Sequence, residues 1–396
     1  MPHHSVLIDV TRLAARLLEG KRPTGVDRVS LAYIAHFRPR ARALVRHWGR
    51  WMALSPAASQ RVFGALLGEE RNPQFTLRSQ VAQALVLRWG LPSGAILFNT
   101  GHSGLDHPLY ALKMQRHGLR PVYFLHDLIP LTHPEYCRAG EVQRHRQRLL
   151  TMLHTGCGII VNSEDTARAL LAFAQENGLA CPPVLTAHLG LNPLPVAADG
   201  APIDSPYFVC VSTIEARKNH LLLLHVWRDL VTRLGAACPK LVLIGQRGWE
   251  CEQVVDLLER CTPLRHVVIE LPDCTDAQLA RWLQHARALL MPSFAEGFGL
   301  PVIEALAARV PVIASDLPAL REVAGDLPHY LDPIDGIGWL EAVRAFASPE
   351  HPLLQRQIQR LDSFSPPTWS AHFDRVEAWL SGLRMTGVAE GAGLSA

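Results

Sequence analysis

The sequence predicts an α/β protein of two domains, each built on a parallel sheet covered by helices. Three observations lead to this fold class. Short apolar runs alternate with longer segments of helical period along most of the chain, which is the pattern of β-α-β units. The 396 residues, 48% of them hydrophobic and 19% charged, suffice for two full cores. Residues 191–206, rich in proline and small side chains and without period, separate the two halves.

The C-terminal half shows the alternation most regularly. We expect strands at 207–211, 241–244, 267–269, 288–291 and 310–314, and helices at 219–234, 250–260, 275–287 and 301–309. In the N-terminal half the clearest strands are 6–8, 95–98, 122–125 and 159–161. The predicted domains are therefore 1–195 and 206–365. A C-terminal helix at 366–385 is expected to pack back toward the N-terminal domain, and the glycine-containing tail at 386–396 is expected to be disordered.

Composition excludes some classes of protein. A formal charge of +3 is too small for dedicated nucleic-acid binding, so no nucleic-acid partner is expected. The eight cysteines are scattered and form no C-x-x-C pair, which indicates reduced thiols. With no leader-like N-terminus and no long apolar run, we expect a cytoplasmic protein. The basic runs 38–42 and 144–148 are typical of solvated helix faces or turns, and peripheral contact with the inner face of the membrane through them stays open.

Residues 292–305 carry the most informative pattern. Two glycines follow the predicted strand 288–291, and Pro301 suits the first position of the next helix. The amides at a helix start form an anion cradle. Glu296 lies before the turn and Glu304 about one turn into the helix, so both can face a ligand held there. The pattern predicts a site for an anion with hydroxyl-bearing neighbours, such as a sugar nucleotide.

A second constellation follows the first strand of the same domain, at 211–220. Arg217 and Lys218 precede Asn219, a plausible N-cap for the next helix. Two cations at this position suit stabilisation of a departing diphosphate.

These residues carry a resemblance to a known family. The segment Glu296-Gly-Phe-Gly-Leu-Pro-Val-Ile-Glu304, with its flanks, resembles the donor-site signature of retaining glycosyltransferases of family 4. The resemblance covers most of the C-terminal domain and implies the GT-B fold, with two Rossmann-like domains facing a central cleft. It implies that Glu296 contacts hydroxyls of the transferred sugar and that Glu304 holds the ribose hydroxyls. The backbone around Phe298, Gly299 and Leu300 would serve the diphosphate and the sugar.

The segment 212–219 resembles the family's Gly-Thr-Leu-Glu-Pro-Arg-Lys-Asn, whose lysine is a diphosphate ligand. This implies that role for Lys218, whereas Arg217 is a weaker candidate, because some members place their further arginine where this chain has Ser212. A second departure follows the signature. Arg309 stands where the family usually has the helix-ending glycine.

Two N-terminal features are expected to complete the site. The loop around Gly25, at 21–29, resembles the family's Thr-Gly-Ile-x-Arg-Val loop, where the glycine lets the backbone approach the diphosphate; Arg28 is open between phosphate contact and surface cover. His126 and Asp127 follow the strand 122–125 in a segment similar to the family's His-Asp-Leu-Ile-Pro. The resemblance implies that His126 lies against the donor sugar, and Asp127 is expected to orient its ring. His102 is a weaker candidate for lining the acceptor side.

Transfer with retention at the anomeric carbon is the expected reaction, from a nucleotide diphosphate sugar to a glycan or lipid-linked glycan. The catalytic candidates are His126, Glu296 and Lys218. Neither a P-loop nor a dinucleotide-binding glycine turn is present, and we expect no metal, because cations and helix amides supply the positive charge. The resemblance to bacterial members favours GDP-mannose as donor, with UDP-glucose next. Two alternatives remain: a non-catalytic GT-B protein that binds a sugar nucleotide or glycan, and a GT-B enzyme of a different reaction type, such as a sugar-nucleotide epimerase.

Overall fold

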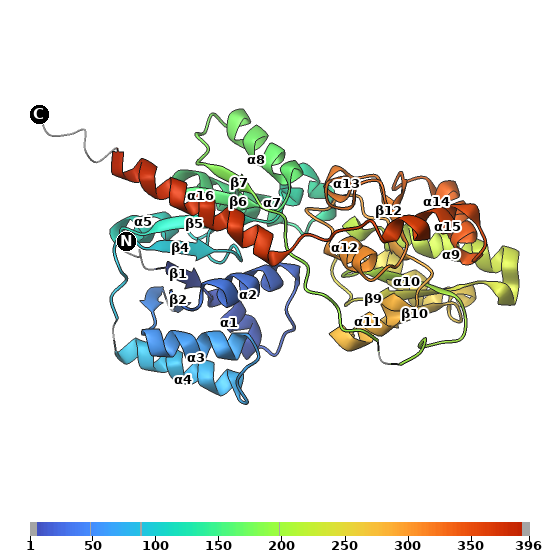
Figure 1. Cartoon of the computed structure of the whole chain (residues 1–396), viewed down its shortest axis with the longest axis horizontal. Helices are drawn as coiled ribbons and strands as arrows, with labels where there is room; N and C mark the ends of the chain where they lie inside the picture. Colours follow the sequence, from blue (N-terminus) through green and yellow to red (C-terminus); the bar gives the residue numbers. More distant parts are fainter. Residues whose placement is uncertain (1–5, 48, 88, 198, 390–396) are drawn as a thin grey trace, which may run out of the picture. The chain divides into compact units, whose positions relative to one another are not determined.

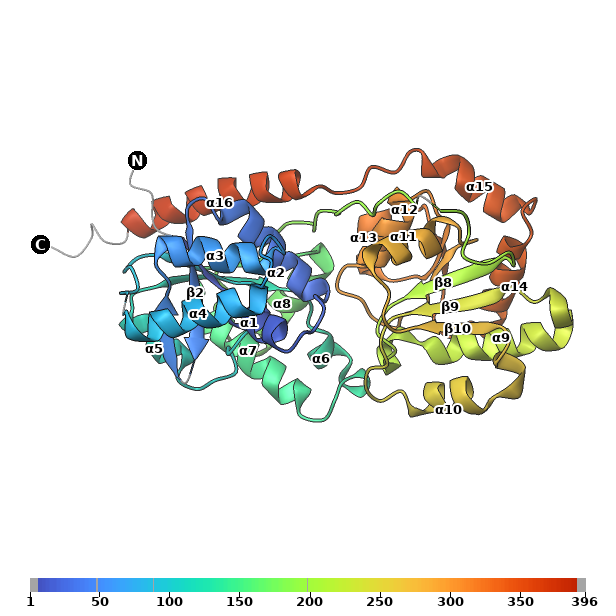
Figure 2. The same cartoon turned by 90° about the horizontal axis from the view of Figure 1, so that it is seen from below.

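The computed structural model describes residues 6–47, 49–87, 89–197 and 199–389. The described residues divide into two compact units. The first, the N-terminal unit, comprises Met1–Leu128, Gln143–Leu189 and Trp369–Ala396, and the second, the C-terminal unit, comprises Ile129–Val142 and Gly190–Thr368. Figures 1 and 2 show a helix-covered sheet in each unit.

Within the described residues, the N-terminal unit contains a seven-stranded sheet of order β3-β2-β1-β4-β5-β6-β7. Strand β3 pairs antiparallel with β2, and the other strand pairs found among the described residues of this sheet are parallel. The strands are β1 (Val6–Asp9), β2 (Ala41–His47), β3 (Arg50–Ala53), β4 (Ile96–Asn99), β5 (Arg120–Leu125), β6 (Gly158–Val161) and β7 (Val184–Thr186). The helices are α1 (Thr11–Leu18), α2 (Gly25–Phe37), α3 (Pro56–Leu66), α4 (Pro73–Val86), α5 (Tyr110–Arg116), α7 (Glu141–Thr155), α8 (Glu164–Glu176) and α16 (Trp369–Ala389).

The four predicted N-terminal strands are present and form the centre of this sheet. Every residue of β1, β4 and β6 is buried, as expected for parallel strands with helices on both faces. Strands β2, β3 and β7 were not predicted. Strand β2 in particular carries Arg42 and Arg46, so it does not read as an apolar run; the interpretation of 38–42 as a helix face or turn is wrong for Ala41 and Arg42.

The C-terminal helix α16 packs within the N-terminal unit (Figures 1 and 2). The fully buried Tyr33 of α2 hydrogen-bonds His372 Nε2 of α16 across 3.0 Å. The rings of His36 and Phe373 stack at 4.0 Å, and the Arg120 guanidinium donates to the carbonyl of Leu383. The helix continues to Ala389, so the prediction of a disordered tail from 386 is wrong for 386–389, and the rest of that tail lies outside the described residues.

The C-terminal unit contains, within the described residues, a six-stranded parallel sheet of order β10-β9-β8-β11-β12-β13. Its strands are β8 (Tyr207–Val211), β9 (Lys240–Ile244), β10 (Val268–Leu271), β11 (Leu289–Met291), β12 (Val312–Ser315) and β13 (His329–Leu331). Its helices are α6 (Ile129–Thr132), α9 (His220–Leu234), α10 (Glu252–Arg260), α11 (Asp276–Gln284), α12 (Leu300–Ala307), α13 (Pro318–Ala324), α14 (Gly336–Ala347) and α15 (Pro352–Leu361). Trp227 and Trp339 are fully buried in the core of this unit.

The division of the chain differs from the predicted domain 1–195 in two segments, of which 190–195 moves the boundary to Gly190. Residues Ile129–Val142 were predicted in the N-terminal domain but count with the C-terminal unit. The physical reason is aromatic packing. The Tyr136 ring stacks on the Phe294 ring with centroids 4.9 Å apart, and the Arg138 guanidinium lies 4.3 Å from the centroid of the Trp249 ring.

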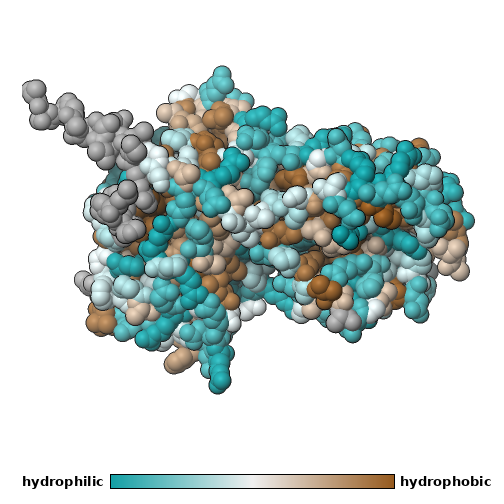
Figure 3. Space-filling model, in the orientation of Figure 1, coloured by the Kyte–Doolittle hydropathy of each residue, from teal (hydrophilic) through white to brown (hydrophobic). Residues whose placement is uncertain are grey.

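The surface mixes hydrophilic and hydrophobic side chains over both units on the face that Figure 3 shows. In the part of the chain that is described, no helix combines the length and apolar character needed to cross a membrane.

Candidate functional site

The predicted glycine turn lies between β11 and α12. Gly299 is the N-cap of α12 and has a left-handed backbone, with φ at 93°. A Cβ at this position would lie 2.3 Å from Leu320 Cδ2, so glycine is required unless Leu320 moves. Pro301 is the second residue of α12, one later than predicted, where its missing N–H is equally harmless. The positive end of the α12 dipole therefore faces this turn.

This turn lies at a topological switch point of the sheet. Strand β11 pairs with β8, although β9 and β10 lie between them in the sequence. The loops that follow β8 and β11 therefore leave the same edge of the sheet side by side, where open α/β sheets bind ligands. A backbone hydrogen bond of 2.9 Å from Phe294 N to the carbonyl of Arg217 joins the two loops.

Four charged side chains meet where these loops touch. Lys218 Nζ lies 2.6 Å from Glu296 Oε1, and Arg217 Nη1 lies 3.1 Å from Glu296 Oε2. Arg217 also donates to Glu215 Oε1 across 2.6 Å and to the carbonyl of Ala295 across 2.8 Å. The side chains of Lys218 and Glu296 are only 11% and 7% exposed. The structure thus brings together Arg217, Lys218 and Glu296, three residues identified as candidates from the sequence, and adds Glu215 to them.

The cluster fixes the protonation of Glu296. Burial raises the pKa of this carboxyl, but Lys218 and Arg217 outweigh it and bring the pKa down to about 2. Burial and the neighbouring Arg217 lower the pKa of Lys218, while Glu296 opposes them. A carboxylate with so low a pKa is a poor proton carrier at neutral pH. Its oxygens accept hydrogen bonds instead, which suits contact with sugar hydroxyls.

Asn219 differs from its predicted role. It occupies the N-cap position of α9, but its backbone is left-handed and its side chain makes no capping hydrogen bond. Its Nδ2 donates instead to the carbonyl oxygens of Pro292 at 3.0 Å and Pro333 at 2.8 Å. Asn219 therefore ties the loop after β8 to the loops after β11 and β13, which fixes the position of Lys218 beside it.

The other predicted donor ligands lie on the turn and the helix it opens. Phe298 and Glu304 are buried, at 4% and 7% exposure. Leu300 is half-buried and begins α12. Phe298, Leu300 and Glu304 therefore lie with Gly299 on the turn after β11 and the first turns of α12. The loop after β8 in the same unit carries Lys218.

Two glycines outside the predicted site clamp the loop after β8. A Cβ at Gly245 would lie 2.1 Å from the carbonyl oxygen of Ser212, and one at Gly248 would lie 2.8 Å from that of Ile214. The loop after β9 therefore packs backbone to backbone on the Ser212 loop, and Ser212 itself faces inward, with its Oγ 3.3 Å from His220 Nε2. The spacing Gly-x-x-Gly after a strand was the available signal for this support.

In the N-terminal unit, His126 follows β5 directly, at the carboxyl end of the strand. It is buried, and its Nε2 donates to the carbonyl oxygen of Thr100 across 2.7 Å. The hydrogen bond that holds this ring goes to Thr100 and not, as predicted, to Asp127, whose charge acts to raise the pKa of His126. Burial lowers the pKa of His126, against the hydrogen bond and Asp127. The ring is therefore a neutral imidazole with the proton on Nε2 and Nδ1 left as an acceptor.

His126 belongs to a cluster of three histidines. The ring centroid of His102 lies 5.2 Å from that of His126 and 6.1 Å from that of His145. His102 Nε2 donates to the carbonyl of Phe124 at 2.8 Å, and His145 Nε2 to that of Asp127 at 3.2 Å. Burial and the two neighbouring rings hold the pKa of His102 well below its usual value. All three backbone acceptors belong to the ends of β4 and β5 or their loops, so the cluster fixes that edge of the sheet.

The loop with Gly25 is held by a buried carboxylate that the sequence reasoning missed. Gly25 is the first residue of α2, and the Thr24 amide before it donates to Asp27 Oδ2 across 2.8 Å. Arg12 Nε and Arg16 Nε lie 2.9 and 2.8 Å from the two Asp27 oxygens. Burial raises the pKa of Asp27, and the bonds from Thr24 and the charge of Arg12 reverse this to a net lowering. The Thr-x-x-Asp spacing was the signal for this capping box.

Ser163 caps α8 by accepting from the amide of Thr166 at 3.2 Å. Asn162 beside it donates to the carbonyl of His126 across 2.9 Å. The Arg144–Arg148 run lies on α7, as a helix face.

Comparisons with known proteins bear on this site. Residues 197–330 match the family model described as "Glycosyl transferases group 1". The chain is 29% identical over 234 residues to the serotype-specific mannosyltransferase WbdA of Escherichia coli, which covers 55% of this chain and 28% of that protein. It is 31% identical over 224 residues to the O-antigen chain mannosyltransferase B of Escherichia coli, 54% of this chain and 58% of the relative. The chain thus spans between about a quarter and three fifths of these relatives.

Solved structures share the fold over nearly the whole chain. HepE of Anabaena, in complex with UDP and glucose, superposes with a TM-score of 0.67 at 14% identity and covers 96% of this chain and 100% of its own. Sucrose-phosphate synthase of Thermosynechococcus elongatus gives 0.64 at 16% identity, covering 97% and 100%.

The matched range 197–330 contains both loops of the charged cluster and the Gly299 turn, so the resemblance inferred from the motif is confirmed over the part that carries it. The two Rossmann-like units agree with the fold of the solved structures. The chain therefore has the GT-B fold, and residues 197–330 of its C-terminal unit match the glycosyl transferases group 1 family model.

Proposed function

We propose that the chain is a retaining glycosyltransferase that moves a hexosyl group, mannosyl by preference, from a nucleotide diphosphate sugar to a glycan or lipid-linked glycan. The observation that carries the proposal is the cluster of Lys218, Arg217 and Glu296 beside the N-terminal end of α12. Two cations and a helix dipole suit a leaving diphosphate, and an ionised carboxylate suits the hydroxyls of the sugar.

The state of Glu296 supports transfer from the front face. An attacking carboxylate needs accessible, basic oxygens, whereas both oxygens of Glu296 contact cations and its pKa is about 2. We infer that the leaving phosphate helps to remove the acceptor proton while Lys218 and Arg217 neutralise its charge. On this proposal the cations supply the charge that a metal would otherwise supply, and no metal is required.

His126 is proposed to stabilise the transition state at the donor sugar. Its neutral ring leaves Nδ1 as an acceptor, which suits a sugar hydroxyl. Gly25 is proposed to let the backbone approach the diphosphate, with Asp27 holding its loop. Phe298, Gly299, Leu300 and Glu304 are proposed as the remaining donor ligands.

The preference for GDP-mannose rests on the relatives, which are named as mannosyltransferases. A UDP-sugar is the second candidate donor, because the HepE structure of the same fold holds UDP and glucose. We further propose a cytoplasmic location with peripheral contact at the inner face of the membrane, through which a lipid-linked acceptor is reached.

A thermal-shift panel with GDP, UDP, GDP-mannose and UDP-glucose tests the donor. A ligand that binds only the native state raises the melting temperature. GDP and GDP-mannose are expected to raise it, and Lys218→Ala is expected to abolish the rise. Lys240→Ala is the matched control, because Lys240 lies in the same unit with its Nζ on the carbonyl of His266. No response to any nucleotide would contradict the proposal, and a response with no transfer would favour the non-catalytic alternative.

A further inference from the structure

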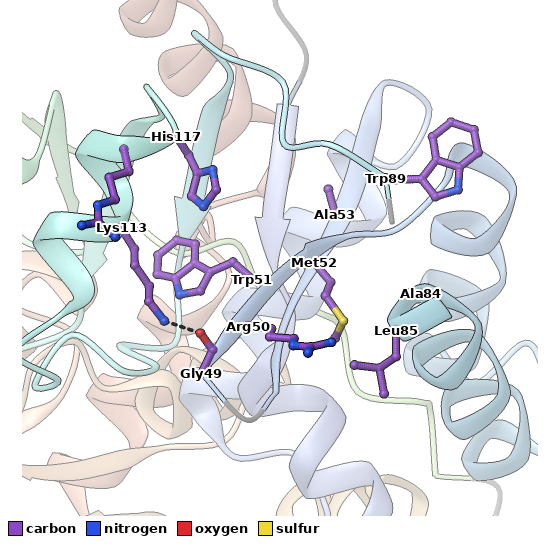
Figure 4. Close-up of a pocket in the computed structure, with 11 residues that line it drawn as sticks. Gly49, Arg50, Trp51, Met52, Ala53, Ala84, Leu85, Trp89, Lys113 and His117 are labelled. Carbon is purple, nitrogen blue, oxygen red and sulfur yellow. Dashed lines mark hydrogen bonds between the residues drawn. The ribbon is translucent and has the colours of Figure 1, made fainter. Parts of the chain in front are cut away.

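The N-terminal unit has a cavity of about 540 Å³ at the β3 edge of its sheet (Figure 4). The cavity is bounded by the β2–β3 hairpin, the end of α4 and the helix α5. Its lining residues are Gly49, Arg50, Trp51, Met52, Ala53, Ala84, Leu85, Trp89, Lys113, Arg116 and His117. The volume is that of a small-ligand site, which typically measures about 300–1,000 Å³. It lies at the outer strand β3, whereas the switch point of this sheet is between β1 and β4.

The charge of the lining has one sign. Arg50, Lys113 and Arg116 contribute cations, His117 contributes an imidazole ring, and none of the lining side chains is acidic. Elsewhere in this unit, Arg38 and Arg46 pair with carboxylates. Arg50 and Arg116 have no such pair among the residues the structure describes. Unpaired cations around a cavity attract an anion and orient it by hydrogen bonds.

Two tryptophans give the cavity apolar surfaces as well. Trp51 is held in place, with its ring centroid 5.0 Å from that of Tyr110 and 5.7 Å from the Arg46 guanidinium. Trp89 is 52% exposed, and Figure 4 shows it and Trp51 on different sides of the cavity. A flat, fixed indole packs against the C–H face of a pyranose ring, and an exposed indole in a pocket marks a binding surface.

A smaller cavity of about 270 Å³ continues from the first one, sharing Gly49, Trp51 and Lys113 with it. It reaches Thr11, just after β1, and Ser103, in the loop after β4. The two cavities therefore form a groove from the carboxyl ends of β1 and β4 around to the edge strand. The dashed line in Figure 4 marks the bond from Lys113 Nζ to the carbonyl of Gly49, which fixes the wall between them.

We propose that this groove binds an acidic saccharide, with Arg50 and Arg116 holding a carboxylate or phosphate substituent and Trp89 packing on a sugar ring. If the chain has the proposed function, the natural ligand of this groove is an acidic portion of the acceptor glycan. Only the identity of this ligand rests on the glycosyltransferase activity; the binding of an acidic saccharide does not. The proposed contacts Arg50, Arg116 and Trp89 line the larger cavity at the β3 edge, whereas only the smaller cavity reaches the switch point between β1 and β4, so the anion-binding part of the groove is an accessory site.

Titration calorimetry on the full chain, without a nucleotide, tests the site. The probes are trigalacturonate, neutral maltotriose of the same length and inorganic phosphate. Trigalacturonate is expected to bind and to weaken with added salt. The double variant R50Q/R116Q is expected to weaken it at least tenfold and Trp89→Ala about fivefold. Arg168→Gln, on an exposed arginine of α8 in the same unit, is the matched control and is expected to change it less than twofold.

Several outcomes would overturn the proposal. They are no binding of trigalacturonate, equal binding of maltotriose, or displacement of trigalacturonate by equimolar phosphate, which would reduce the site to a small-anion site. Displacement by phosphatidylglycerol vesicles would instead assign the surface to a membrane. Trp89 is half exposed, so Trp89→Ala leaves the core intact and a folding failure cannot mimic the expected loss. Lys218→Ala is expected to retain trigalacturonate binding, so failure of the donor proposal and failure of this one are distinguishable.

Discussion

The pair of Lys218 and Glu296 offers the sharpest energetic test of the site. We consider Lys218→Met, which keeps the length of the side chain and removes its charge, and Glu296→Gln, which keeps the shape of the carboxyl group. Both side chains are largely buried, at 11% and 7% exposure, and their charged atoms lie 2.6 Å apart. Removing either partner leaves a buried charge in the other, which is costly.

The pKa of Glu296 gives the magnitude. The difference between its value of about 2 and the ordinary 4.5 corresponds to about 3 kcal/mol of preference for the ionised form. Lys218 is the larger of the two favourable charges and Arg217 the smaller. We therefore expect each single variant to lose about 2 kcal/mol of unfolding free energy in the C-terminal unit, and the coupling energy of the pair in a double-mutant cycle to be about 2 kcal/mol.

The assay is urea unfolding at pH 7 for wild type, both single variants and the double variant. Hydrogen exchange of peptides from β8 and β11 assigns the transition to the C-terminal unit. A lowered carboxyl pKa stabilises the fold above the unfolded value and loses that contribution as pH falls through the folded value. The difference between wild type and Glu296→Gln is thus expected to hold above pH 4.5 and to vanish toward pH 2. A coupling energy below about 0.5 kcal/mol, or a difference without pH dependence, would refute the reasoning.

Four further outcomes follow from single residues. His126→Ala is expected to lower kcat with little change in donor affinity, and full turnover at saturating substrates would remove that residue from the mechanism. Gly299→Ala is expected to cost several kcal/mol in denaturant unfolding, well beyond the roughly 1 kcal/mol for Gly178→Ala, since both have positive φ but only Gly299 has a side chain in the way. Arg309→Gly is expected to stabilise by about 1 kcal/mol, because Arg309 adopts a left-handed backbone with φ at 58°. A loss of stability would mean that the ion pair of Arg309 with Asp362, at 3.0 Å, outweighs the relief of the backbone. Burial lowers the pKa of His220 to about 3 in the folded protein, against 6.5 for an exposed histidine. Below about pH 6.5 the unfolded chain therefore binds a proton at this position that the folded protein does not bind, and the free energy of unfolding falls. At pH 5 this costs about 2 kcal/mol relative to pH 7, and replacement by Gln should flatten that part of the pH profile.

The sequence predicted those parts of the fold that local pattern controls. Strand β8 was predicted at its observed bounds, because buried parallel strands read as continuous apolar runs. In the sequence, Arg309 stands where the family usually has a glycine that ends the helix. In the structure Arg309 follows α12 and has the left-handed backbone that such a glycine would adopt, with φ at 58°. Strand β2 was missed, because Arg42 Nε donates to the carbonyl of Leu54 and Arg46 pairs with Asp9, so its charges are satisfied by tertiary partners.

The site was predicted residue by residue but not in its contacts. Lys218 and Glu296 are 78 positions apart, and no local signal indicates that they form an ion pair. Asn219 was expected to cap α9, since Asn favours that position, but the carbonyls of Pro292 and Pro333 compete for its side chain. The partner of His126 was predicted to be the adjacent Asp127, but it is the carbonyl oxygen of Thr100, which is distant in sequence and gives no local signal.

The central proposal is the transfer of a hexosyl group from a nucleotide sugar with retention. One measurement tests it most directly. Proton NMR of the wild-type protein with GDP-mannose and a mannose-terminated acceptor follows GDP release and the anomeric signal of the product together. We expect release of GDP coupled to a product with the α configuration of the donor, and loss of both in Lys218→Ala. A β-linked product, or GDP-mannose that binds and stays intact with every acceptor tried, would contradict the proposal.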